Sequence, residues 1–177
     1  RFEEVAHDEV KNHLRLRDAG RILDLMKCDP EKGFKKPVIV TVNGMVNMDE
    51  DEISIEVVET YGHWPTIGMT GPKGEYDACI GYNVSSSSYK SRYGDQGVGM
   101  DMDRCLFNKG EGDNSLYQRN VIKKGDVIRM VVKNHTLTYY HNNKRLKFRE
   151  NPITLLKNRD YKFAVGLDGT ASVRIVE

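Results

Sequence analysis

The sequence predicts an all-β domain built as a two-sheet antiparallel sandwich. Short apolar stretches alternate with polar residues at a period of two, which is the pattern of strands with one buried face. Turn-forming residues separate these stretches roughly every 8–12 residues. A helical period is almost absent, and no repeat of fixed length indicates a propeller or a solenoid. The 177 residues are enough for one domain with a sizeable core.

The clearest of these stretches runs from Gly125 to Leu146. Its alternation predicts two strands joined by Lys133–His135, where Asn134 tolerates a left-handed backbone. Asn142–Asn143 predicts a second tight turn, because Asn accepts positive φ. The stretch holds no nucleophile, acid–base pair or metal cluster, so we interpret it as scaffold. The residues expected to face inward are Ile128, Met130, Val132, Leu137 and Tyr139.

The first half of the chain begins with a mixed, charged segment. Residues 1–13 predict a short N-terminal helix or an ordered tail, and the sandwich is expected to span residues 14–177. Asp18–Gly20 is a turn signal, and the acidic run Asp49–Glu52 predicts a solvated loop. Strands are expected at 14–17, 21–26, 37–42, 53–58 and 66–70.

The second half follows the same pattern with longer loops. Residues 83–99 contain four consecutive serines and several glycines, and 109–114 also predict a loop. Asp168–Gly169 predicts the turn before the last strand. Besides the hairpin of residues 125–146, strands are expected at 78–82, within 100–107, and at 152–156, 161–167 and 171–177.

Composition limits the function classes. Apolar residues make up 38% and charged residues 30%, and a net charge of +1 gives no overall bias towards nucleic acid or acidic membranes. The cysteines Cys28, Cys79 and Cys105 are odd in number and widely spaced, which favours buried thiols in a reducing, intracellular compartment, cytoplasmic or nuclear. No run reaches the length of a membrane span, and no signal segment is found. Because the chain starts at Arg1, we expect an excerpt of a larger protein.

The order of the strand motifs resembles the SPRY domain family over roughly Leu14 to Glu177. Thr138–Asn143 is similar to the Phe-Tyr-x-Asn-Gly hairpin of the family, with Tyr139 for Phe and Asn143 for Gly. Further similar segments are Arg15–Ile22, Ile53–Val57, Ile67–Met69, Ile80–Asn83 with Ser88–Tyr89, and Gly125–Ile128. The resemblance implies a concanavalin-like jelly roll. It also implies a non-catalytic module that binds a peptide or protein partner through loops at one end of the sandwich, without a cofactor.

Aromatic and arginine side chains in two predicted loops are the candidate partner-binding residues. Trp, Tyr and Arg most often carry interface energy, and loops carry function on β-scaffolds. The alternatives are that Trp64, the single tryptophan, fills the core between the sheets, and that His63 is an ordinary loop histidine. The candidates are Tyr61, His63, Trp64, Tyr89, Arg92 and Tyr93.

Enzyme function is not predicted. None of the five histidines belongs to a pair with zinc-ligand spacing, and neither a Gly-x-Ser-x-Gly elbow nor a Walker sequence occurs. Asp101 and Asp103 lack the Glu-x-Asp-x-x-Glu spacing of glycosidases with this architecture. We therefore expect no catalytic residue, metal or cofactor.

Two other binding functions remain as alternatives. A basic cluster beside Tyr139 and Tyr140 is a possible RNA or DNA contact, although lysine at a strand edge also protects against aggregation. A lectin is the second alternative, with glycosylation-like triplets at Asn83–Ser85 and Asn134–Thr136. A protein or peptide is the expected partner; a membrane is not, and the sequence predicts no oligomeric state. The basic cluster consists of Lys144, Arg145, Lys147 and Arg149.

Overall fold

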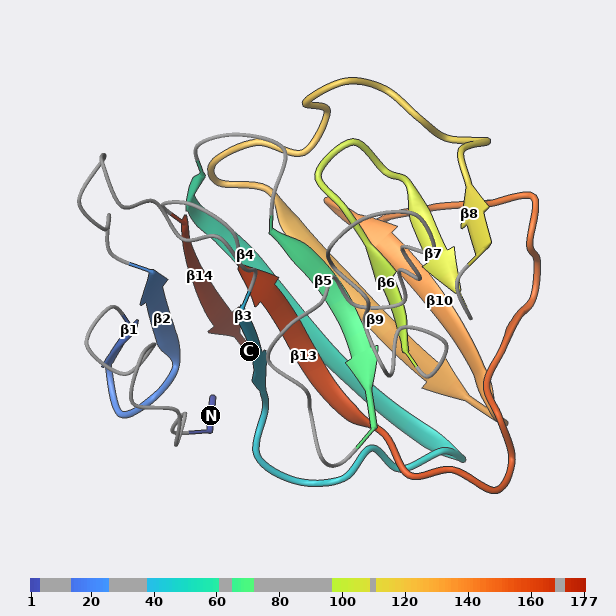
Figure 1. The fold of residues 1–177 in the computed structure, drawn as a ribbon, viewed down its shortest axis with the longest axis horizontal. Helices are drawn as coiled ribbons and strands as arrows, with labels where there is room; N and C mark the ends of the chain where they lie inside the picture. The colour runs from blue at the N-terminus through green and yellow to red at the C-terminus, as the bar shows by residue number, and fades with distance from the viewer. Residues whose placement is uncertain (4–13, 26–37, 61–64, 72–96, 109–110, 168–170) are drawn as a thin grey trace, which may run out of the picture.

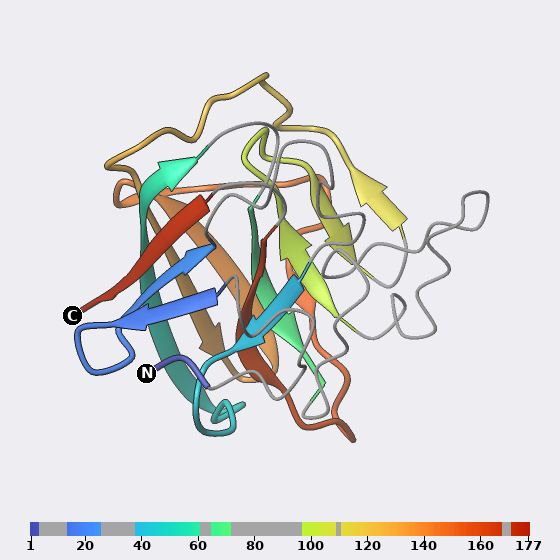
Figure 2. The same cartoon turned by 60° about the vertical axis from the view of Figure 1, so that its left-hand side comes forward.

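The computed structural model shows two antiparallel sheets packed face to face (Figures 1 and 2). It describes residues 1–3, 14–25, 38–60, 65–71, 97–108, 111–167 and 171–177. Helices are absent from these ranges, and none of the described residues forms a helix that is long and apolar enough to cross a membrane. The predicted all-β sandwich is confirmed.

The first sheet has eight strands and contains both the first strand, β1, and the last strand, β14. The last strand, β14, pairs with β2 on one side and with β4 on the other, so the chain ends inside the sheet rather than at its edge. Its order is β1 (Leu14–Arg17), β2 (Ile22–Leu25), β14 (Ala171–Val176), β4 (Glu50–Thr60), β9 (Val127–Lys133), β10 (Thr136–His141) and β11 (Lys144–Arg145), with β12 (Ile153–Thr154) also beside β10.

The second sheet covers the first. Its central strand β5 pairs with β13 through Val165↔Ile67 and with β6 through Gly68↔Gly99. A Cβ on Gly68 would lie 2.1 Å from the carbonyl oxygen of Val98, so only glycine allows these two strands to approach. The order is β3 (Val38–Thr41), β13 (Lys162–Leu167), β5 (Thr66–Thr70), β6 (Val98–Met100), β7 (Leu106–Asn108) and β8 (Glu111–Asp113).

The hairpin of β9 and β10 has the predicted register and turns. Asn134 and His135 have φ values of 47° and 59°, and Asn142 and Asn143 have 47° and 66°, so both two-residue turns use positive φ. The inward-facing residues are at most 2% exposed: Ile128, Met130, Val132, Leu137 and Tyr139.

Tyr139 connects the two sheets. Its hydroxyl donates a hydrogen bond to the carbonyl oxygen of Ile67 in β5, 3.0 Å away, and its ring packs edge-on against Phe148 with centroids 6.2 Å apart. The side chain is fully buried, which raises the pKa of the phenol far above its usual range. One residue of the hairpin therefore fixes how the sheets face each other.

Two loop predictions are wrong. Residues 50–52 of the acidic run begin β4 instead of forming a loop, and their charges stay at the surface because Glu50 and Glu52 are exposed. Residues 111–113 form β8 by pairing with β7. Phe2 is 4% exposed, and its N–H donates to the oxygen of Gly20, so the first residues pack against the sandwich. The predicted helix within residues 1–13, the strand at 78–82 and the loop at 83–99 fall largely or wholly outside the described residues.

Removing the Tyr139 contact is expected to weaken the packing of the sheets. Tyr139→Phe deletes the buried hydrogen bond and is expected to cost about 1–2 kcal/mol of unfolding free energy, and Tyr139→Ala about 3–5 kcal/mol. Urea denaturation measures both. Tyr117→Phe, at a side chain that is 55% exposed, is the control and should leave stability within about 0.5 kcal/mol. Parental stability of Tyr139→Phe would contradict the assignment.

Candidate functional site

The predicted partner-binding residues of the loops lie outside the described residues and stay predictions. They are Tyr61, His63, Trp64, Tyr89, Arg92 and Tyr93. The structure does describe what flanks the first of these loops. Residues 61–64 connect Thr60 of β4 to the buried Pro65 before β5. At this end of the sandwich β4 and β10 end and β9 begins, and we call it the loop end. The N–H of Gly125 donates to the oxygen of Val57 there.

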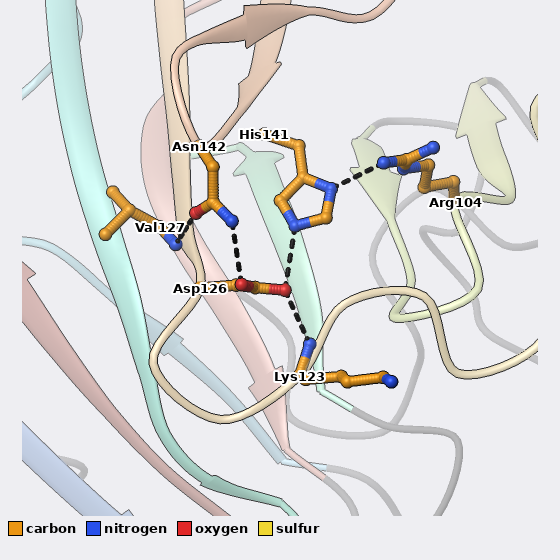
Figure 3. Close-up of polar contacts among 6 residues, drawn as sticks. All are labelled: Arg104, Lys123, Asp126, Val127, His141 and Asn142. Carbon is orange, nitrogen blue, oxygen red and sulfur yellow. Dashed lines mark hydrogen bonds and ion pairs between the residues drawn. The ribbon is translucent and has the colours of Figure 1, made fainter.

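A hydrogen-bonded cluster around Asp126 stabilises the loop end (Figure 3). The Asp126 carboxylate accepts from Nδ2 of Asn142 at 2.7 Å, from the backbone N–H of Lys123 at 2.9 Å and from Nε2 of His141 at 2.8 Å. Oδ1 of Asn142 in turn accepts from the N–H of Val127 at 2.8 Å. The cluster therefore joins the start of β9 to the turn after β10.

The hairpin register brings these residues together. Asp126 directly precedes β9, and His141 ends β10 opposite Ile128. His141 is 8% exposed because it continues the inward series of Leu137 and Tyr139. The sequence analysis did not select His141 as a functional candidate. The same period of two, extended by one step, would have indicated a buried histidine that needs polar partners.

Arg104 determines how His141 uses its two ring nitrogens. An NH2 nitrogen of Arg104 lies 2.6 Å from Nδ1 of His141, and a guanidinium can only donate. Nδ1 is therefore the acceptor, and Nε2–H donates to Asp126. Both nitrogens are occupied by protein groups, so the imidazole has no free lone pair for general-base chemistry. The cluster is a structural support for the loop end.

The pKa of Asp126 reflects this support. Burial alone would raise the pKa, but hydrogen bonds from Asn142, from the N–H of Lys123 and from His141 outweigh burial and lower the pKa of the carboxyl group below its usual value. The carboxylate form is thus the form that the folded state stabilises.

The carboxylates of Asp101 and Asp103 also accept hydrogen bonds from backbone N–H groups. Oδ1 of Asp101 accepts from the N–H groups of Asp103 at 2.9 Å and Cys105 at 2.8 Å, and Asp103 accepts from the N–H of Asn120. Both residues are less than 10% exposed. Within the described part of the chain, no group of three or more His, Cys, Asp or Glu side chains is placed to hold a metal ion.

Cys105 is a buried thiol, as the cysteine usage predicted. It is 8% exposed, and burial together with the negative charges of Asp101 and Asp103 raises its pKa to about 11. Thiolate is the nucleophilic form, so this cysteine is unreactive near neutral pH.

The structure brings the basic cluster together along one side of the sandwich. Its four side chains are exposed, and between them Leu146 and Phe148 are 8% and 4% exposed. The expected aromatic partners are not available for base stacking. Tyr139 is fully buried, and the guanidinium of Arg129 covers the ring of Tyr140 at 4.3 Å from the centroid. We call Lys144, Arg145, Lys147 and Arg149 the basic edge.

Comparison with known proteins supports the fold through structure alone. No protein-family model and no curated protein sequence matches the chain. The SPRY domain of human HERC1 superposes with a TM-score of 0.66 at 12% identity, covering 100% of this chain and 98% of that one. The TRIM65 PSpry domain gives 0.65 at 15% identity, covering 99% and 88%. This chain has the fold of a SPRY domain.

Part of a larger protein is also similar to this chain. Stonustoxin superposes with a TM-score of 0.61 at 12% identity, and the match covers 99% of this chain but 26% of the toxin chain. Another human SPRY domain gives 0.58 at 14% identity, covering 92% of this chain and 94% of that one. At such identities the SPRY likeness establishes the architecture, and each residue's role must be argued from this chain.

Asp126→Asn tests the support of the loop end. The substitution is expected to cost about 1–3 kcal/mol near pH 7, because the amide places a donor against one of three donors. Since the folded-state pKa of Asp126 is lowered, its stabilisation is complete above the unfolded value and is lost as the pH falls through the folded value. The difference from the parent should therefore shrink below about pH 4.

Urea denaturation from pH 7 down to about pH 2.5 measures this difference. Asp160→Asn makes the same charge change at an exposed residue and is the control. A constant difference across the whole range would show that the carboxylate is not the stabilising form.

The unreactive thiol is tested by alkylation. In a Cys28→Ser/Cys79→Ser variant, Cys105 is expected to resist iodoacetamide at about pH 8 in the native protein, because less than about 1% of a thiol with a pKa near 11 is thiolate there. Mass spectrometry before and after unfolding in guanidinium measures the modification. Rapid labelling of the native protein would contradict the assigned burial and pKa.

Proposed function

We propose that this domain is a non-catalytic protein-interaction module that binds a peptide or a folded protein through its loops. The first of these follows β4 at the loop end, and the second connects β5 to β6, whose flanking ends lie at the other end of β5. The observation that carries the proposal is the SPRY fold, matched over 100% of this chain and 98% of the human HERC1 SPRY domain. The likeness to SPRY domains implies binding through loops that the sandwich presents. The partner-contacting residues we propose are Tyr61, His63, Trp64, Tyr89, Arg92 and Tyr93.

The described geometry is compatible with this function. The Asp126 cluster gives the loop end a rigid, hydrogen-bonded base, and Lys124 pairs with Glu59 across the same region at 2.9 Å. Rigid support reduces the entropy that a binding loop loses when it contacts a partner. The buried His141 and the acidic pair Asp101 and Asp103 are engaged by the protein itself, which favours binding over catalysis.

The compartment is part of the same proposal. An odd number of widely spaced cysteines favours a reducing environment, and Cys105 is buried as a free thiol. We therefore propose an intracellular partner in the cytoplasm or nucleus.

Trp64→Ala and Tyr93→Ala test the loop surface. Each is expected to remove at least one specific partner, with a loss of binding of about tenfold or more if the side chain is an interface hot spot. Affinity purification from native cells followed by mass spectrometry identifies the partners, and titration with the purified partner gives the affinity. Thermal unfolding confirms that each variant is folded.

Tyr117→Ala is the matched control, because it removes an exposed aromatic side chain from a described loop elsewhere in the chain. Its partner set should equal that of the parent. If Trp64→Ala and Tyr93→Ala, both folded, also retain every partner of the parent, the proposed loop surface is wrong.

A further inference from the structure

The basic edge lies on an unpaired margin of the first sheet. β11 is the last strand in the sheet order, and none of the described strands pairs with its outer side. The N–H of Leu146 points towards β10 and donates to the oxygen of Tyr139 at 2.9 Å. Because successive residues of an extended chain point their backbone groups to opposite sides, the N–H and C=O of Arg145 point outward. Such an edge can accept another strand.

Three of the four cations of the basic edge lack carboxylate partners among the described residues. Elsewhere on the same sheet arginines are paired: Arg17 with Asp24, Arg174 with Glu56, and Arg129 with Glu52. By contrast, Lys144, Arg145 and Lys147 have no acidic group within ion-pair distance among the described residues. Positive charge is therefore available at this margin for a ligand, whereas most of the sheet neutralises its own.

The basic edge continues the alternation of β11 as far as Lys147, whereas the backbone N–H of Arg149 already donates to Oγ of Ser115 at 2.9 Å. Arg145, Lys147 and Arg149 are exposed and alternate with the buried Leu146 and Phe148. Alternate side chains of an extended chain lie roughly 7 Å apart on one face. A neighbouring strand presents its own alternate side chains at the same interval, so acidic residues at every second position of that strand can meet Arg145 and Lys147.

Tyr140 and Arg129 extend the surface beyond the edge. Tyr140 lies directly opposite Arg145 in the register of β10 and β11, and Arg129 stacks on the Tyr140 ring at 4.3 Å. Directly opposed residues have Cβ atoms about 5 Å apart. Arg145 thus adjoins a preformed arginine–tyrosine pair, and both residue types are enriched at interface hot spots.

We propose that the basic edge docks an acidic, extended segment of a partner protein, which adds to the first sheet as a strand beside β11. Backbone hydrogen bonds would provide the pairing, and acidic side chains at every second position would meet Arg145 and Lys147. The site begins directly after the Asn142–Asn143 turn and contains none of the loop residues of the proposed function.

A polyanionic nucleic acid fits this margin less well. Tyr139 is buried and the Tyr140 ring is already covered by Arg129, so neither supplies a stacking platform. A short acidic strand needs only the edge itself.

Fluorescence anisotropy with labelled ten-residue peptides tests the proposal on the whole chain. One peptide alternates Glu with Thr, and its isomer has the same composition with the glutamates in one block. We expect the alternating peptide to bind at least about tenfold more tightly. N-methylation of the residues whose N–H groups face β11 should abolish binding, whereas N-methylation of the intervening residues should not. Equal binding of both isomers, or indifference to N-methylation, overturns strand addition.

Variants locate the site. Arg145→Glu/Lys147→Glu should weaken binding of the alternating peptide at least about tenfold, and Arg145→Gln/Lys147→Gln should do so less strongly. Lys133→Glu/Lys157→Glu changes the net charge equally at exposed residues outside the basic edge and should leave the affinity unchanged. Thermal unfolding confirms that each variant is folded. If Trp64→Ala loses the loop partners and Arg145→Glu/Lys147→Glu retains them, the two sites are separate. Equal weakening by the control pair overturns the site.

Two other occupants are outcomes of the same test. A labelled mixed-sequence single-stranded RNA that binds more tightly than the alternating peptide, and is released by Arg145→Glu/Lys147→Glu, would overturn the peptide in favour of nucleic acid. Analytical ultracentrifugation measures self-association of the chain. Self-association that is lost both in Arg145→Glu/Lys147→Glu and in Asp49→Lys/Asp51→Lys would overturn the peptide in favour of a second copy of the chain.

Discussion

The contact between Tyr139 and Ile67 is the constraint on which the arrangement of the sandwich depends. A phenol that is fully buried must find an acceptor, and the carbonyl oxygen it finds belongs to the opposite sheet. Apolar packing alone would let two twisted sheets slide, because it has no direction. One hydrogen bond with a fixed direction joins the layers at this point, and the edge-on contact to Phe148 packs the Tyr139 ring.

The same hairpin that carries Tyr139 also contributes to the Asp126 cluster and to the basic edge. Towards the loop end, its side chains at positions 141 and 142 close the cluster around Asp126. Beyond the turn at Asn142–Asn143, the chain doubles back as β11 and places Arg145 opposite Tyr140. Because one hairpin holds both the Asp126 cluster and β11, their positions relative to the core are set by the same register.

The local sequence pattern predicted most of this hairpin. The features that the pattern missed depend on contacts between segments that are distant in the sequence. The inward series from Ile128 to Tyr139 follows from a period of two, which is a property of the strand itself. β8 forms because residues 111–113 meet β7, and acidic, glycine-containing segments carry little strand preference of their own. The buried His141 was missed because titratable side chains suggest exposure, although its position in the alternation indicated the core. Of the candidate residues, the structure therefore describes those on the hairpin margin, and the loop candidates depend on conformations that no local period specifies.

An unpaired sheet margin poses a physical problem that charge can solve in two ways. Lysine and arginine along an edge oppose pairing with a second identical edge, since like charges repel. The same charges favour pairing with an acidic strand, so protection against self-association and selection of a partner are one arrangement. What separates this margin from a merely protected one is the arginine–tyrosine pair beside it and the absence of neutralising carboxylates around Lys144, Arg145 and Lys147 among the described residues. Arginine at Arg145 and Arg149 adds the planar, bidentate geometry that carboxylates match, which a solubilising lysine lacks.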